Sequence, residues 1–236
     1  MTLPDPSPAP FPATSPAPSA DPFPAASPAP SAAAVPSPSA APLPTFVTPP
    51  ASGARLIYLM GASGSGKDTL LRLLRAHLTD DEPVLVAHRY ITRDSGGTED
   101  ALRLSTEEFA RRAALGCFAL RWASHGLHYG IGIEIDTWLA YGAAVIVNGS
   151  REHLEQAHAR YPAMTAVEIT VDPARLAERL AGRGRESAEQ IVQRLSRATQ
   201  AFAVPQSCAL KRVSNDADPQ AAAATLLGIA RDMLAR

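Results

Sequence analysis

The sequence predicts an α/β domain in which a parallel β-sheet is flanked by helices. The first indication is a glycine-rich turn that separates an apolar run at 56–60 from a helical segment at 69–78. The second is that short apolar runs alternate with helical segments from there to the end of the chain. This alternation is typical of parallel sheets wrapped by helices, which bind ligands at the carboxyl ends of their strands.

The glycine-rich turn fits the phosphate-binding pattern G-x-x-x-x-G-K-[ST] at every place but the last, where Asp68 replaces the hydroxyl residue. Glycines let the backbone curl so that successive N–H groups point at a polyphosphate, and Lys67 reaches the outer phosphates. An ordinary strand-to-helix turn needs neither three glycines nor a lysine. We therefore expect nucleotide phosphates to be held by Gly61, Ala62, Ser63, Gly64, Ser65, Gly66, Lys67 and Asp68.

Residues 1–50 differ in composition from the rest of the chain. They hold most of its 22 prolines, are otherwise rich in Ala and Ser, and carry only two charged residues, Asp5 and Asp21. A segment without apolar periodicity cannot build a core, so we predict a disordered extension that acts as a tail or tether. Residues 54–236 have the size of one ordinary domain.

Neither targeting nor membrane signals stand out. The first residues lack the basic stretch and continuous apolar run of a secretory signal, and no later run is long and apolar enough to span a membrane. We therefore expect a cytoplasmic protein without membrane partners. The net charge of −1 argues against nonspecific binding to nucleic acid.

The elements after the first helix follow from apolar runs and turn residues. Ser105 and Glu108 predict a capping box at the start of a helix, and His125-Gly126 predicts the turn of a hairpin that forms a small acceptor-binding insert. In chain order we expect a strand at 84–87, a helix at 105–115, hairpin strands at 118–123 and 127–131, a helix at 134–141, a strand at 143–147, a helix at 152–160 and a strand at 166–171.

The last third of the chain predicts a mobile basic lid. Asp172-Pro173 and Asp218-Pro219 each place a capping carboxylate before a proline at the first helical position. Between them, two glycines interrupt a helix amid three arginines, at 179–186. Ser187 with Gln190 predicts the cap of a helix that continues through Arg194 and Arg197.

The cysteines and two of the histidines are expected to be structural. Cys117 and Cys208 are far apart in apolar surroundings, which favours reduced core residues. His88 and His128 flank the predicted pocket, where we expect hydrogen-bonding or packing roles, because two histidines without a third ligand make a poor metal site.

Five features follow one another along the chain: the phosphate loop, Thr92-Arg93, Arg121-Trp122-Ala123 with His128-Tyr129-Gly130, the Arg-Gly lid and 213–216. In this order they resemble the guanylate kinase group of P-loop kinases. Finer details at Gly66-Lys67-Asp68, 87–94, 129–136 and 147–151 are similar, within that group, to the ribose 1,5-bisphosphate phosphokinases of phosphonate catabolism. The resemblance implies that ATP phosphorylates the 1-phosphate of ribose 1,5-bisphosphate, giving 5-phosphoribosyl 1-diphosphate and ADP. The alternatives are a guanylate or other nucleoside monophosphate kinase and a non-enzymatic nucleotide-binding module.

The resemblance also implies roles for individual residues. Lys67, Arg183 and Arg194 are expected to act on the transferring phosphoryl group, since positioning and charge neutralisation carry this chemistry. Arg179, which could equally be a charge on a helix surface, and Asn215 are expected at the nucleotide. For the sugar phosphate we expect contacts from Arg89, Tyr90, Arg93, Arg121, Tyr129, Glu134 and Asp136. For Glu134 and Asp136, exposed surface charges are an equal alternative. ATP and the sugar phosphate are thus the expected partners, and a homodimer is compatible with the sequence.

Arg121 bears on which acceptor the protein binds. It stands where guanylate kinases place a glutamate that holds the guanine edge, and a cation cannot accept bonds from the guanine N–H groups. Arg121 could instead bind a phosphate of the acceptor. The alternative is a solvated strand residue.

Mg²⁺ is the expected metal, with Asp68 and Thr69 as candidate ligands. In phosphate-loop enzymes a hydroxyl follows the lysine and a carboxylate ends a neighbouring strand. Here the loop supplies the carboxylate Asp68, and the strand at 143–147 is followed by the uncharged Asn148. We hypothesise that the carboxylate of the metal site has moved from the end of the strand to position 68 in the loop. The alternative is that Asp68 only stabilises the start of the helix through its dipole.

Overall fold

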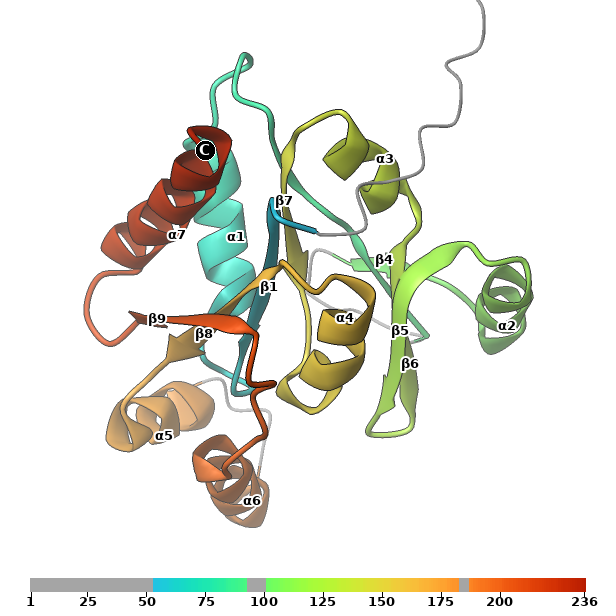
Figure 1. The fold of residues 1–236 in the computed structure, drawn as a ribbon. Helices are drawn as coiled ribbons and strands as arrows, with labels where there is room; N and C mark the ends of the chain where they lie inside the picture. Colours follow the sequence, from blue (N-terminus) through green and yellow to red (C-terminus); the bar gives the residue numbers. More distant parts are fainter. Residues whose placement is uncertain (1–52, 93–100, 183–186) are drawn as a thin grey trace, which may run out of the picture. The chain divides into compact units, whose positions relative to one another are not determined.

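A computed structural model describes residues 53–92, 101–182 and 187–236, so the predicted extension at 1–50 lies outside the described residues. Its main sheet has five strands in the order β2-β7-β1-β8-β9, and every neighbouring pair is parallel (Figure 1). The predicted parallel sheet flanked by helices is therefore confirmed. The strands are β1 (Leu56–Gly61), β2 (Val84–Val86), β7 (Ala144–Asn148), β8 (Thr165–Thr170) and β9 (Ala209–Ser214).

Strand β1 lies at the centre of the sheet because its side chains are apolar on both faces. Leu56 through Met60 are fully buried. Alternate residues of a strand point to opposite faces, so Ile57 and Leu59 join one core while Leu56, Tyr58 and Met60 join the other. The rigid centre of the molecule therefore ends directly in the glycine-rich turn.

Helices cover both faces of the main sheet. On one face lie α1 (Lys67–Ala76) and α7 (Pro219–Leu234); α3 (Glu134–Ala140) and α4 (Leu154–Arg160) lie on the other (Figure 1). Helix α1 ends two residues before the predicted position. The 3₁₀ turn η1 (Arg151–His153) precedes α4.

The insert is a second sheet of four strands in the order β4-β3-β6-β5. The predicted hairpin is confirmed, with His125 and Gly126 both at positive φ in its turn. Strands β3 and β4 were not predicted, because three-residue strands carry no visible alternation and form only by pairing with their neighbours. The bounds are β3 (Arg89–Ile91), β4 (Ala101–Arg103), β5 (Phe118–Ser124), β6 (Leu127–Gly132) and, for the covering helix, α2 (Thr106–Ala114).

The predicted helix caps are largely confirmed. The Asp172 carboxylate accepts from Ala174 N at 2.9 Å at the start of α5 (Pro173–Gly182). A capping box begins α6 (Ala188–Thr199). At α2 the Ser105 hydroxyl accepts from Glu108 N at 3.1 Å, whereas the Glu108 side chain turns outward and accepts from Arg112 at 2.7 Å. The helix starts in this part of the chain are therefore encoded locally.

The prediction for the cysteines differs in one detail. Cys117 and Cys208 are both free thiols, but only Cys208 is buried, and Cys117 is half-buried at the edge of the insert. Within the ranges given above, no helix is long and apolar enough to cross a membrane.

Candidate functional site

The phosphate loop joins the carboxyl end of β1 to the first turn of α1. The loop is held open by Gly66, whose φ of 90° is left-handed. Lys67 folds back over the loop, where its Nζ donates to Gly61 O at 2.8 Å and to Ala62 O at 3.1 Å. Ser63 and Thr69 are exposed at its rim. Helix N–H groups without intrahelical acceptors thus face the same space as the lysine.

Asn215 supports this loop from behind. It follows β9, is 2% exposed, and donates from Nδ2 to Ser65 O at 2.8 Å. A side chain at Gly66 would meet that same Nδ2 atom at 2.5 Å, so glycine is required there. Arg179 in turn donates to Asn215 O at 2.6 Å. The predicted nucleotide residues Arg179 and Asn215 therefore buttress the loop, and their contact with a nucleotide stays a prediction.

Asp68 lies between the loop and the neighbouring strand β7. Its Oδ1 accepts from Asn148 Nδ2 at 2.9 Å and lies 3.9 Å from the Arg89 guanidinium. Among the described residues, Asn148 Oδ1 is buried and accepts no hydrogen bond. The two residues that the charge-exchange hypothesis joins are thus in direct contact.

Arg89 and Tyr129 come together on the face of the insert that looks toward the phosphate loop. The Arg89 guanidinium lies 5.5 Å from the centre of the Tyr129 ring, and its side chain is only 13% exposed. Trp122 stacks on Tyr129 at 5.4 Å and His153 stacks on Trp122 at 5.5 Å. Burial lowers the pKa of His153 below its usual value, which favours a neutral ring in this row.

Two other acceptor candidates, Tyr90 and Arg121, lie on the opposite face of the insert. Tyr90 follows Arg89 in β3, so its side chain points away from the loop and packs against Phe118 at 5.5 Å. Arg121 pairs in register with Gly130 and is exposed. The Glu134 carboxylate lies against Gly132 of β6, where an added side chain would meet it, and its charge, after burial, raises the pKa of Tyr90. The structure therefore does not bring these three residues together with Arg89 and Tyr129.

The surroundings of Asp136 correct the prediction that this carboxylate binds the sugar. It is 8% exposed, and accepts from Arg160 at 2.6 Å and from the Tyr161 hydroxyl at 2.5 Å. A carboxylate whose two oxygens are both used in this way joins α3 to the end of α4, which is a structural role. Burial, together with the bond to Asp136, raises the pKa of Tyr161.

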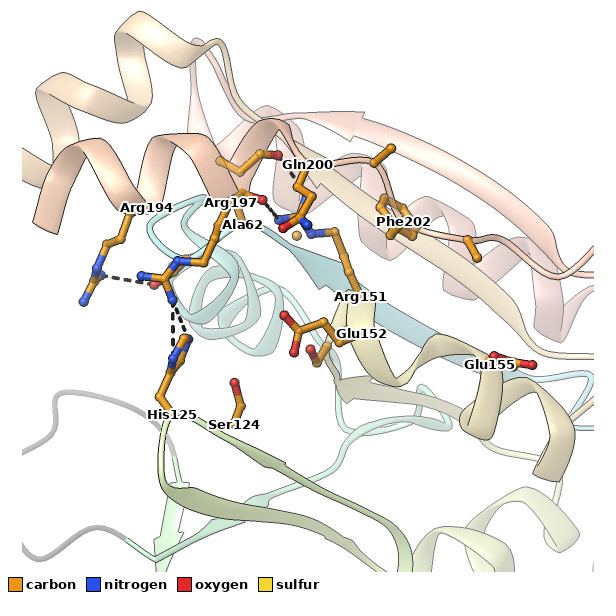
Figure 2. Close-up of a pocket in the computed structure, with 16 residues that line it drawn as sticks. Ala62, Ser124, His125, Arg151, Glu152, Glu155, Arg194, Arg197, Gln200 and Phe202 are labelled. Carbon is orange, nitrogen blue, oxygen red and sulfur yellow. Dashed lines mark hydrogen bonds between the residues drawn. The ribbon is translucent and has the colours of Figure 1, made fainter.

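The basic lid approaches the loop through α6. Arg194 donates to the Ser63 hydroxyl at 3.2 Å, and Arg197 lies 2.9 Å from the His125 ring at the hairpin tip (Figure 2). The predicted residues Arg183 and Arg93 lie outside the described residues.

A cavity of about 440 Å³ opens between the loop, the hairpin tip and α6. Figure 2 shows Arg194 and Arg197 reaching down from α6 while His125 and Ser124 rise from the hairpin. Sequence reasoning missed Arg151 and His125 as part of this site, and named Arg197 only as a residue of the lid helix. Arg151 stands in one of the sequence blocks that carry the family resemblance, but its partner Arg197 lies 46 residues away on α6.

The donor set at the loop suits a hard cation held by few protein oxygens. In the part of the chain that the structure describes, no group of three or more His, Cys, Asp or Glu side chains is placed to hold a metal. His128 instead stacks on Phe109 at 5.5 Å, in agreement with a packing role.

The chain is similar to curated proteins over most of its length. It is 81% identical over 186 residues to the ribose 1,5-bisphosphate phosphokinase PhnN of Achromobacter xylosoxidans (strain A8), covering 79% of this chain and 97% of that protein. It is 52% identical over 164 residues to the protein of the same name from Burkholderia pseudomallei (strain K96243), covering 70% of this chain and 88% of that one. A scan against models of protein families found no match.

Solved structures agree at the level of the fold. A guanylate kinase from Anaplasma phagocytophilum superposes with a TM-score of 0.56 and 15% sequence identity, covering 77% of this chain and 86% of that chain. At this identity the likeness concerns the arrangement of the sheet and helices.

Proposed function

The chain belongs to the ribose 1,5-bisphosphate phosphokinase family and phosphorylates ribose 1,5-bisphosphate, and we propose that ATP is the donor and 5-phosphoribosyl 1-diphosphate the product. An oxygen of the acceptor's 1-phosphate forms a bond to the γ-phosphorus of ATP. The bond from that phosphorus to the β,γ-bridging oxygen breaks, and ADP leaves. The observation that carries this proposal is that Lys67 lies on the loop while Arg89 of the insert lies 3.9 Å from Asp68, the residue that follows Lys67.

The phosphate loop holds the donor in this proposal. Lys67 already points along the loop, and exchanging its carbonyl partners for phosphate oxygens requires only a side-chain movement. The N–H groups at the start of α1 add partial positive charge at the same place. Arg194, bonded to Ser63 at the rim of the loop, neutralises charge on the transferring group together with Arg183.

Arg89 and Tyr129 hold the acceptor. A largely buried guanidinium offers a planar fork that fits phosphate oxygens, and the Tyr129 ring keeps it in place. The acceptor phosphate is largely dianionic near neutral pH, because the second pKa of a phosphate monoester is about 6. No general base is needed for the attack.

The residues around Asp68 fit a magnesium ion. Asp68 offers a carboxylate, and the buried Oδ1 of Asn148, which accepts no bond from any described residue, offers a second oxygen. Mg²⁺ takes oxygen ligands and keeps several waters, so two protein oxygens and the ATP phosphates suffice. The ion supplies charge neutralisation for the phosphates. Asp68 and Asn148 would hold it, and the exposed Thr69 hydroxyl stays a candidate further ligand.

Phosphorus NMR of the purified protein with ATP and Mg²⁺ tests the proposal. With ribose 1,5-bisphosphate, we expect the γ-phosphate signal of ATP to disappear while ADP and a new sugar diphosphate appear. GMP in a parallel sample should react far more slowly, because Arg121 replaces the carboxylate that reads guanine. Faster reaction of GMP would favour the nucleoside monophosphate kinase, and no ATP consumption in either sample would favour a non-enzymatic module.

A further inference from the structure

Arg151 contacts the carboxyl end of the lid helix from the end of β7. Its two terminal nitrogens donate to Ala198 O at 2.8 Å and to Arg197 O at 2.7 Å. These carbonyls lie in the last turn of α6, where the helix no longer offers partners four residues ahead and its dipole is negative. Arg151 therefore binds the one part of α6 that attracts a cation.

The base of Arg151 is anchored to the strand that carries the phosphate loop. The buried Tyr58 hydroxyl donates to Ser150 O and accepts from Ser150 N, both at 2.9 Å. Burial raises the pKa of Tyr58 well above its usual value, so the hydroxyl keeps its proton. A side chain at Gly149 would overlap the Tyr58 ring, so only glycine lets the chain pass this close.

The same helix reaches the phosphate loop one turn earlier. Arg194 donates to the Ser63 hydroxyl, while Arg151 holds the helix end and lies 5.6 Å from the Phe202 ring that follows it. Figure 2 shows Arg151 and Arg194 at opposite sides of the cavity, both joined to α6. A continuous set of contacts thus runs from β1 through Ser150 and Arg151 to α6 and back to the loop.

We propose that Arg151 is a positioning residue for phosphoryl transfer: its two-pronged contact with the end of α6 sets the place of Arg194 above the phosphate loop. This rests on the proposed role of Arg194 in the transfer. The planar fork of arginine can bind two carbonyls at once, whereas the ammonium of lysine acts as a point charge. The contact is therefore specific to arginine.

The kinetic test compares Arg151→Ala, Arg151→Lys, Arg194→Ala and the double variant Arg151→Ala/Arg194→Ala, with the exposed Arg111→Ala on α2 as the control. We expect Arg151→Ala to lower kcat by about 10²-fold, the cost of misplacing a catalytic group by about 1 Å, with acceptor KM changed only a few-fold. The kcat of Arg151→Lys should lie between those of the wild type and Arg151→Ala. In the Arg194→Ala background, removing Arg151 should cost almost nothing further, because the group it positions is already gone.

Hydrogen exchange of the α6 amides separates positioning from general destabilisation. Arg151→Ala and Arg151→Lys should speed exchange over α6 while amides of β1 stay protected, and Arg111→Ala should leave both unchanged. Full additivity of the two arginine losses, or unchanged α6 exchange in Arg151→Ala, would overturn the proposal. If the wild-type protein fails to phosphorylate ribose 1,5-bisphosphate while α6 exchange still responds to Arg151, the proposed function fails and the contact stands.

Discussion

At the scale of single residues, the site depends on cations that already have oxygen partners. Lys67 bonds two loop carbonyls, Arg194 bonds a loop hydroxyl, and Arg89 lies near the Asp68 carboxylate. In the proposed function, each cation is thereby held close to the phosphate oxygens that it binds. Binding then exchanges one set of oxygens for another and needs little reorganisation, which is how preorganised charges stabilise a transition state.

Replacing Lys67 with alanine should lower kcat by on the order of 10² to 10³, because a charge that stabilises the transferring phosphoryl group is lost. Lys211→Ala is the matched control, since Lys211 is exposed on β9. Steady-state rates with saturating ATP and acceptor measure both. A Lys67→Ala enzyme with the turnover of the control would remove Lys67 from the mechanism.

Asp68→Ser should raise the Mg²⁺ concentration needed for half-maximal rate, since the loop then offers the ion a weaker oxygen. Adding Asn148→Asp should bring the required Mg²⁺ concentration partly back toward that of the wild type. The side chains at 68 and 148 touch, so the new carboxylate returns the negative charge to the same place. Magnesium titrations of the three enzymes give the comparison. If Asp68→Ser leaves the curve unmoved and only lowers stability, by the 0.3 to 1 kcal/mol or so of a helix-dipole contact, Asp68 is a helix-end residue and not a ligand.

At the scale of elements, an ion pair ties the connection before β2 to the last helix. Arg231 on α7 donates to Glu82 at 2.5 Å. This bond, together with the Thr79 backbone N–H, lowers the pKa of Glu82 from 4.5 to about 2. The pair joins α7 to a loop next to an edge strand of the sheet, so it bears on stability and lies apart from the phosphate loop.

Glu82→Gln should lower the melting temperature at pH 7. Because the pKa of Glu82 is lower in the folded protein, the stabilisation is complete above pH 4.5 and is lost as the pH falls toward 2. The difference between variant and wild type should therefore shrink over this range in melting curves by circular dichroism. Glu178→Gln, an exposed carboxylate on α5, is the control. A difference that does not depend on pH would mean that the charge of Glu82 contributes nothing.

At the scale of the whole molecule, the core of the described residues is centred on β1. Both hydrophobic clusters draw on β1, one with α1 and α7 and the other with α3, α4 and the insert. The proline-rich residues 1–50 have no comparable apolar pattern. The kinase domain should therefore carry the stability and the activity without them.

Deleting residues 1–50 should leave the melting temperature and the turnover nearly unchanged, since that composition cannot bury enough apolar surface to join a core. Calorimetry and steady-state kinetics of the full-length and shortened proteins give the answer. A melting temperature lower by several degrees would show that the segment contributes to the folded domain.

Local features of this fold could be predicted from neighbouring residues alone. The strand, turn and helix around Lys67, the caps at Asp172 and Ser187, and the hairpin turn at His125 each depend on a few consecutive residues. Backbone sterics and first-turn hydrogen bonds act over such short distances, so the sequence by itself determined these elements and, through them, the parallel sheet.

Only the tertiary structure decided which charged residues face the site. Asp68 and Asp136 are both carboxylates at the start of a helix, yet one lies beside Asn148 at the phosphate loop and the other is buried against Arg160. Arg151 likewise gains its meaning from α6, 46 residues further on. Burial and pairing are set by partners distant in the chain, and no spacing within the sequence encodes how those partners come together.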